Sequence, residues 1–141
     1  CTGGLLAELI TSVPGSSEAF AGGVVVYTNA MKRDLLGVPA GLLEGPDAPG
    51  AISRETAAAM AERTLERIGA DYALAITGVA GPSPSEGKPP GLVYVALSER
   101  GGRTDVHELK LAGGREGVRL RAAKHALYRL WERLSGFVTK S

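Results

Sequence analysis

Apolar residues recur along the chain at two different spacings, which predict helices and strands in alternation. Four short segments rich in valine, leucine, isoleucine and alanine predict strands, at residues 23–27, 72–77, 92–97 and 105–111. Three consecutive valines in the first segment, from Val24 to Val26, are typical of a strand that is buried on both faces. Gly101 and Gly102 separate the last two segments and predict an antiparallel hairpin.

Apolar residues at helical spacing predict helices around and between these strands. We expect helices at residues 5–13, 29–36, 53–68 and about 116–134. Ser53 stands at the N-cap of the third helix, and Gly69 follows its last residue, where a left-handed cap is expected. The Gly- and Pro-rich stretches at 40–50 and 78–91 predict loops.

This order of elements predicts an α/β fold, a three-layer α/β/α sandwich on a mixed, mostly parallel sheet with an antiparallel hairpin. We expect residues 1–141 to form a single domain, because the chain is too short for two ordinary ones. Sites in such folds collect at the C-terminal ends of parallel strands. Tyr27 and Thr77 both stand at such ends, so we expect them to share a site.

Composition narrows the class of function. The 16 Lys and Arg residues nearly balance the 15 Asp and Glu residues, which favours neither a nucleic-acid partner nor a membrane surface. Cys1 is the single cysteine, so no internal disulfide can form, and we expect a cytoplasmic protein. His107 and His125 have no metal-ligand spacing, and we expect neither a metal nor another cofactor.

Ser17, Tyr27 and Lys32 are the candidate catalytic residues. A serine hydroxyl becomes a good nucleophile when a base takes its proton, and a lysine whose pKa is lowered by burial can be that base. A tyrosine hydroxyl can relay the proton, so either Lys32 or Tyr27 could deprotonate Ser17. The alternative is structural: the serine caps a turn, the tyrosine ends a strand, and the lysine is solvated. Each residue taken alone favours the structural interpretation. The three together make the catalytic and the structural interpretations about equally favoured.

Glycine-containing turns supply candidate substrate-binding residues. Thr77-Gly78 runs into a loop whose backbone N–H groups can hold an anion or an oxyanion. Arg115, after two glycines and before the last helix, suits a phosphate or a carboxylate, and Thr2-Gly3-Gly4 is a similar feature before the first helix. A tight turn or a helix-start ion pair is the alternative in each case.

Eight short motifs follow one another along the chain: Cys1-Thr2-Gly3-Gly4, Pro14-Gly15-Ser16-Ser17, Gly23 to Lys32, Leu36-Gly37-Val38-Pro39, Gly50-Ala51-Ile52-Ser53, Ile76 to Pro82, Lys88-Pro89 with Gly91, and Gly114-Arg115-Glu116. Taken in this order, they resemble the C-terminal domain of the competence-damage-inducible protein CinA over nearly the whole chain.

The resemblance implies an amidohydrolase that converts nicotinamide mononucleotide and water to nicotinate mononucleotide and ammonia without a metal. It implies Ser17 as nucleophile with Tyr27 and Lys32 as activating partners, and Thr77 and Arg115 in substrate binding or catalysis. It also implies a self-associating protein, and an N-terminal domain of the same polypeptide is a further expected partner. A catalytically weak nucleotide-binding or regulatory domain, and a serine amidase or esterase with another small substrate, are the alternatives.

The chain departs from the family pattern at its start. The family has a helix and a strand ending in Ala-Glu-Ser before the Cys-Thr-Gly-Gly turn, whereas this chain opens on Cys1. We therefore expect that it lacks the first helix and strand of the domain. The 40–50 loop is also longer than usual, and Gly81-Pro82-Ser83-Pro84-Ser85 lacks the usual run of glycines.

Overall fold

Three strands form one sheet in the computed structural model, which describes residues 1–136. In the order of the sheet they are β1 (Tyr72–Gly78), β2 (Leu92–Glu99) and β3 (Thr104–Lys110). Both pairings are antiparallel, with Ala96 of β2 between Ala75 and Val106. The predicted hairpin is confirmed, since β2 and β3 are joined across Gly101 and Gly102.

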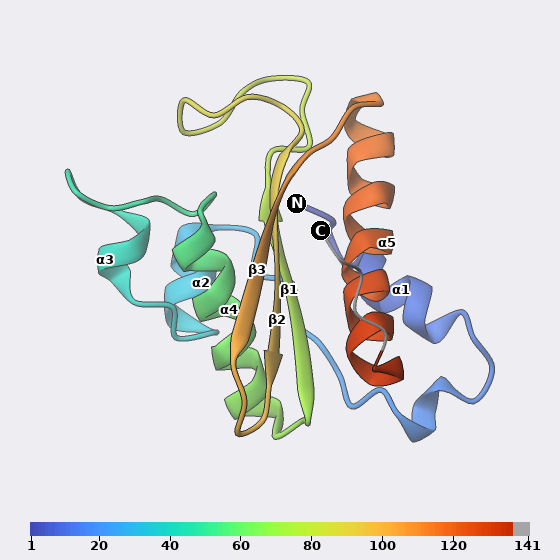
Figure 1. The fold of residues 1–141 in the computed structure, drawn as a ribbon. Coiled ribbons are helices and arrows are strands. Elements are labelled where there is room, and N and C mark those ends of the chain that lie inside the picture. Colours follow the sequence, from blue (N-terminus) through green and yellow to red (C-terminus); the bar gives the residue numbers. More distant parts are fainter. Residues whose placement is uncertain (137–141) are drawn as a thin grey trace.

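Helices lie on both sides of this sheet (Figure 1). The helices are α1 (Leu5–Thr11), α2 (Asn29–Asp34), α3 (Ala40–Leu43), α4 (Arg54–Ile68) and α5 (Gly114–Ser135), with a 3-10 turn, η1, at Ser16–Glu18. Figure 1 shows α2, α3 and α4 on one side and α1 and α5 on the other. The four predicted helices are confirmed, while α3 occupies part of the predicted 40–50 loop.

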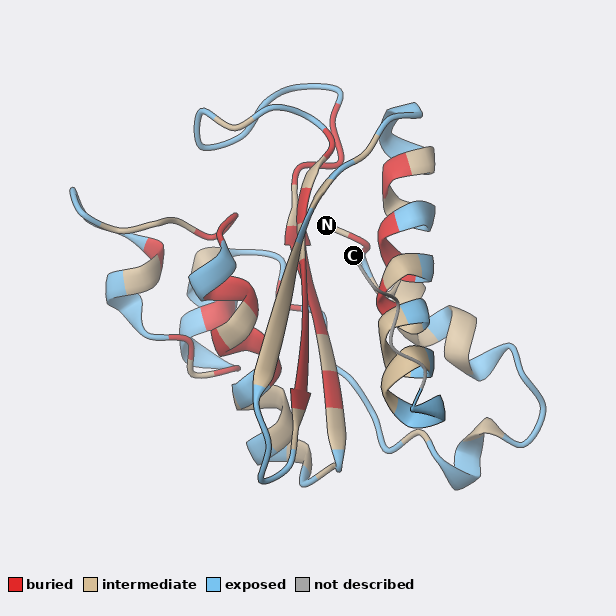
Figure 2. Cartoon of the chain, viewed as in Figure 1, coloured by how far each residue is buried: buried red, intermediate tan, exposed pale blue. Residues whose placement is uncertain are grey.

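Two apolar cores follow from the alternation of side chains along the strands. Successive residues of a strand point to opposite faces, so Ala75 packs with α4 and Ile76 with α5. Small residues in both helices, such as Ala57 and Ala122, allow close packing on the sheet and are fully buried. Figure 2 shows the buried positions gathered on β1, β2 and the sheet-facing sides of α4 and α5.

The prediction of a mostly parallel sheet is not met. Residues 23–27 are extended but belong to no strand, and every described pairing is antiparallel. Val24 and Val25 are 44% and 57% exposed, and only Val26 is buried, so the expected burial on both faces is also wrong. The physical reason is that an extended segment without a backbone partner cannot form a ladder.

A groove separates this extended segment from β1. It has a volume of about 810 Å³ and is lined by Val24, Val25 and Val26 on one side and by Ala73 and Ile76 on the other. Among residues 1–136, β1 pairs only with β2, so its other edge has no strand partner.

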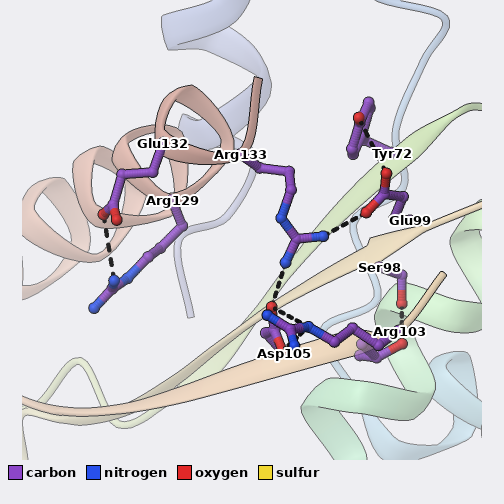
Figure 3. Close-up of polar contacts among 9 residues, drawn as sticks. Tyr72, Ser98, Glu99, Arg103, Asp105, Arg129, Glu132 and Arg133 are labelled. Carbon is purple, nitrogen blue, oxygen red and sulfur yellow. Dashed lines mark hydrogen bonds and ion pairs between the residues drawn. The ribbon is translucent and has the colours of Figure 1, made fainter. Parts of the chain in front are cut away.

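The end of α5 is fastened to the hairpin by charged side chains (Figure 3). Arg133 contacts Glu99 of β2 at 2.5 Å and also Asp105 of β3. Tyr72 donates to Glu99 at 3.3 Å, which extends the cluster to the start of β1. No helix within residues 1–136 is both long enough and apolar enough to span a membrane.

Candidate active site

Several of the predicted site residues meet in one cavity at the end of β1. The cavity has a volume of about 420 Å³, and its lining includes Tyr27, Lys32, Thr77, Gly78 and Arg115. These residues come from the extended 23–27 segment, α2, β1 and α5, which are distant in sequence. The expectation that Tyr27 and Thr77 share a site is therefore met, although the sheet is not parallel.

Lys32 points into this cavity from α2. Thr28 caps the helix by accepting a hydrogen bond from the Met31 N–H at 3.2 Å. The lysine is only 7% exposed, and its amine donates to the Tyr27 carbonyl at 3.3 Å. Burial lowers the pKa of Lys32, and the negative charge of Glu86 opposes this effect. A lysine with a lowered pKa can act as a general base.

Tyr27 and Arg115 meet above Lys32. The Arg115 guanidinium lies 3.5 Å from the Tyr27 hydroxyl and donates to the Gly81 carbonyl at 2.6 Å. Tyr27 is 64% exposed, so its hydroxyl is open to a ligand. Arg115 stands in the first turn of α5, although the sequence predicts that the helix begins after it. Its partners are a carbonyl and a phenol rather than an acidic side chain.

Thr77 and Gly78 form the floor where β1 ends. Thr77 is buried, and its hydroxyl donates to the Ala51 carbonyl at 2.7 Å, which ties β1 to the segment before α4. A Cβ at Gly78 would lie 2.7 Å from the side chain of Val93, so the close approach of β2 requires glycine there.

Thr2, Gly3 and Gly4 line the groove rather than the cavity. The Thr2 carbonyl accepts a hydrogen bond from Arg119 at 2.8 Å, and both glycines have positive φ, 63° and 96°. These residues therefore form the tight turn into α1. Cys1, which precedes them, lines both the groove and the cavity.

Ser17 is not brought to the cavity. It lies in η1, is exposed, and lines neither the cavity nor the groove. Figure 1 shows this short blue turn below α1, near the level where β1 begins, whereas the cavity lies where β1 ends. The expectation that Ser17 stands beside Tyr27 and Lys32 is thus not met. Gly15, with a φ of 88°, turns the chain from α1 into η1, and η1 contacts α1.

Comparison with known proteins identifies the family of this fold and cavity. The CinA C-terminal domain model matches residues 1–134. A competence-damage inducible protein of Geobacillus kaustophilus is 46% identical over 134 residues, which is 95% of this chain and 32% of that protein. The chain belongs to the CinA C-terminal domain family.

Solved structures of CinA proteins share the fold. A competence/damage inducible protein of Agrobacterium tumefaciens is 44% identical, with a TM-score of 0.86 over 93% of this chain and 79% of that one. A competence damage-inducible protein A of Klebsiella pneumoniae is 34% identical, with a TM-score of 0.90 over 98% and 84%. This chain thus spans about a third of the length of the first curated relative and most of each solved one.

Positive charge dominates the cavity of this CinA domain. Arg115 and Lys32 both line it. Glu86 is the one carboxylate among the described lining residues. Such a site favours an anionic ligand. The residues described contain no group of three or more His, Cys, Asp or Glu side chains that could hold a metal.

Sequence reasoning missed Glu86, which lines the cavity of the CinA domain, and Lys88, which binds the same neighbouring segment as Glu86. They lie in the loop between β1 and β2, and both contact the segment that precedes α4. Lys88-Pro89 contributed only to the resemblance, and Glu86 was not singled out. The available signal was a pair of opposite charges two residues apart in a loop that directly follows a buried strand.

Proposed function

We propose that this domain is an amidohydrolase that deamidates nicotinamide mononucleotide to nicotinate mononucleotide and ammonia. The observation that carries the proposal is a buried lysine with a lowered pKa beside a tyrosine, in a cavity that Arg115 also lines. A phosphate suits Arg115, while Lys32 is left for the amide. Membership of the family supports the activity, because some of its members are amidohydrolases.

The proposed base is Lys32, since its amine is buried and its pKa is lowered. To act as the base, Lys32 needs a hydroxyl inside the cavity from which it can take a proton, and Ser17 lies outside the cavity. We assign the attack instead to a serine joined to Cys1, the last residue of the Ala-Glu-Ser pattern, because Cys1 itself lines the cavity. The Tyr27 hydroxyl, held by Arg115, orients the reacting amide.

The reaction would proceed through an acyl-enzyme. The serine oxygen bonds to the carboxamide carbon while its proton passes to the Lys32 amine. Backbone N–H groups at Ala80 and Gly81, which line the cavity, would hold the oxyanion. The C–N bond then breaks, and the lysine proton leaves with ammonia. Water, deprotonated by the same lysine, attacks the ester carbon. The bond to the serine oxygen breaks, the lysine returns the proton to that oxygen, and the acid product ionises to the carboxylate.

Ammonia release from nicotinamide mononucleotide tests the proposal in a protein that carries Ala-Glu-Ser before Cys1. We expect activity in the parent and in Ser17→Ala, and loss of at least a hundredfold in kcat when Lys32→Met or alanine at the preceding serine is introduced, consistent with a general base worth about 10²–10⁴. No ammonia from the parent would refute the deamidase. Loss of activity in Ser17→Ala alone would return the nucleophile to Ser17.

We also propose that the groove receives the segment that precedes Cys1, as a strand parallel to β1. Residues 23–27 and β1 both run toward the cavity, and Cys1 lies where the groove meets it. A strand inserted between them would satisfy both unpaired edges and would give the mixed sheet predicted from the sequence. Such a strand, matched to the seven residues of β1, would span about 23 Å.

Amide hydrogen exchange tests this insertion. A chain extended by the family's helix and strand should show slower exchange in residues 72–77 than a chain extended by Gly and Ser to the same length. Equal exchange in both would refute the insertion. Protection that appears only as the protein concentration rises would instead place a second copy in the groove.

A further inference from the structure

Two side chains fasten the loop between β1 and β2 to the segment that leads into α4. The Glu86 carboxylate accepts hydrogen bonds from the N–H groups of Ala51 at 3.1 Å and Ile52 at 3.2 Å. The Lys88 amine donates to the Pro49 carbonyl at 2.8 Å and to the Ile52 carbonyl. Opposite charges thus bind the N–H and C=O groups of one short segment, and the two side chains lie 3.5 Å apart. We call this arrangement the Glu86–Lys88 clamp.

The backbone of the loop is shaped to present both side chains. Ser85 and Lys88 exchange two hydrogen bonds, from the Ser85 N–H at 3.1 Å and from the Lys88 N–H at 2.8 Å. Glu86, within this turn, has a φ of 53°, the only positive value for a described residue other than glycine. A left-handed conformation is unfavourable for glutamate and persists where surrounding contacts hold it. The bonds from Ala51 and Ile52 are those contacts.

The same loop supports the residues on the opposite wall of the cavity. Its Gly81 carbonyl accepts the 2.6 Å hydrogen bond from Arg115, and Arg115 lies against the Tyr27 hydroxyl. A displacement of the loop would therefore move the Gly81 carbonyl that orients Arg115. The position of Arg115 beside the Tyr27 hydroxyl would change with it.

The clamp also determines the charge that faces Lys32. Three groups from different segments line the cavity around this amine: the Tyr27 phenol, Arg115 of α5 and Glu86 of the loop. Glu86 is the only one of them that is negative, and its position is fixed by the two backbone N–H groups it binds.

We infer that Glu86 and Lys88 are positioning residues of the cavity, which hold the loop so that Gly81 orients Arg115 and Glu86 faces Lys32. The consequence for catalysis rests on the proposed function. The clamp itself does not, because it can be observed in the protein without substrate.

Two variants separate the contributions of the clamp, and each has a control of the same chemistry. Glu86→Gln keeps the shape of the side chain and removes its charge; Glu66→Gln makes the same change in an exposed ion pair of α4. Lys88→Met removes the two hydrogen bonds that Lys88 donates to carbonyls. Lys124→Met is its control, because it replaces lysine by methionine at an exposed position of α5. Amide exchange and NMR titration of the Lys32 amine are measured for all four proteins and the parent.

In Glu86→Gln we expect the amides of Ala51 and Ile52 to exchange roughly tenfold faster, the loss expected for weakening one hydrogen bond to a charged group. The titration of Lys32 should move to lower pH, because the negative charge that favours its charged form is gone. Lys88→Met should speed exchange in the loop while moving the Lys32 titration less. Neither control should change either measurement.

Unchanged exchange and an unchanged Lys32 titration in Glu86→Gln would overturn the inference. An equal shift of the titration in both clamp variants would overturn the direct role of the Glu86 charge. If the protein deamidates the mononucleotide, Glu86→Gln should also move the acidic limb of its kcat/KM profile to lower pH. A protein that shows the exchange and titration effects without deamidation would refute the proposed reaction and leave the clamp in place.

Discussion

Replacing Lys32 by methionine should stabilise the protein while removing its proposed base. The lysine is 7% exposed, and the single hydrogen bond described for its amine is a long one, 3.3 Å to the Tyr27 carbonyl. Its pKa is lowered, so the buried environment disfavours the charged form. Methionine has a similar length and preserves the apolar contacts of the stem. Replacement of a buried charge by an apolar group of similar volume is often stabilising, and we expect about 1–2 kcal/mol at neutral pH.

The stability advantage of Lys32→Met should depend on pH, and the lowered pKa of Lys32 fixes the direction of that dependence. The unfolded lysine holds its proton up to its ordinary pKa of 10.5, whereas the folded one releases it at a lower pH. Between those two values the unfolded state binds more protons, so the stability of the parent protein rises with pH. Methionine binds no proton. The advantage of Lys32→Met should therefore be complete below the folded pKa and should shrink as the pH approaches 10.5.

Urea unfolding at neutral pH and near pH 10 measures both effects. With a slope of about 2 kcal/mol per molar urea, the midpoint at neutral pH should rise by roughly 0.5–1 M without a change of slope. Lys124→Met, at an exposed position of α5, is the control and should change the midpoint little. A destabilised Lys32→Met at neutral pH, or an advantage that persists undiminished near pH 10, would refute the reasoning.

Three further predictions concern packing and the cavity. Arg133→Met should lower the free energy of unfolding by about 1–2 kcal/mol, because two partly exposed ion pairs to the hairpin are lost. Urea unfolding measures this loss, and an unchanged free energy would show that the ion pairs in Figure 3 contribute little to stability. Gly91→Ala should lower the free energy of unfolding by about 2–4 kcal/mol, since φ is 94° and a Cβ would overlap the Leu111 carbonyl. Calorimetry measures this loss. Gly101→Ala is the control and should lower the free energy of unfolding less, because Gly101 has a positive φ but open space around it. Tyr27→Phe should lower kcat for deamidation with little effect on stability, because the phenol is exposed; an unchanged kcat would remove Tyr27 from the site.

The sequence predicted helices, the hairpin and most of the cavity because these depend on local signals. Ser53 caps α4 and Gly69 ends it with a left-handed φ of 71°, as the pattern indicates. Thr77 and Tyr27 reach one cavity because each follows an apolar stretch that leads out of the core. The pairing of the strands could not be predicted in this way, since it depends on which edges find a partner. Residues 23–27 have the composition of a strand and no partner among residues 1–136.

Ser17 shows the corresponding limit for the site. Two hydroxyls a few residues before a strand end seemed close to it, but the Pro14-Gly15 turn and η1 carry them away from the end of β1. Glu86 and Lys88 show the opposite error. Their partners lie 34 to 39 residues away and are backbone groups, which leave no mark in the identity of the residues that carry them.

Three polar side chains of the cavity each donate a hydrogen bond to a carbonyl from another segment. Lys32 binds the Tyr27 carbonyl, Thr77 binds that of Ala51, and Arg115 binds that of Gly81. A backbone acceptor is in place only when the segment that carries it has docked, so these side chains acquire their positions together with the fold and not before it. Substitutions that loosen any of the three segments should therefore reduce activity by displacing the catalytic side chains, even where those side chains are unchanged. The Glu86–Lys88 clamp prevents such a displacement at the loop between β1 and β2.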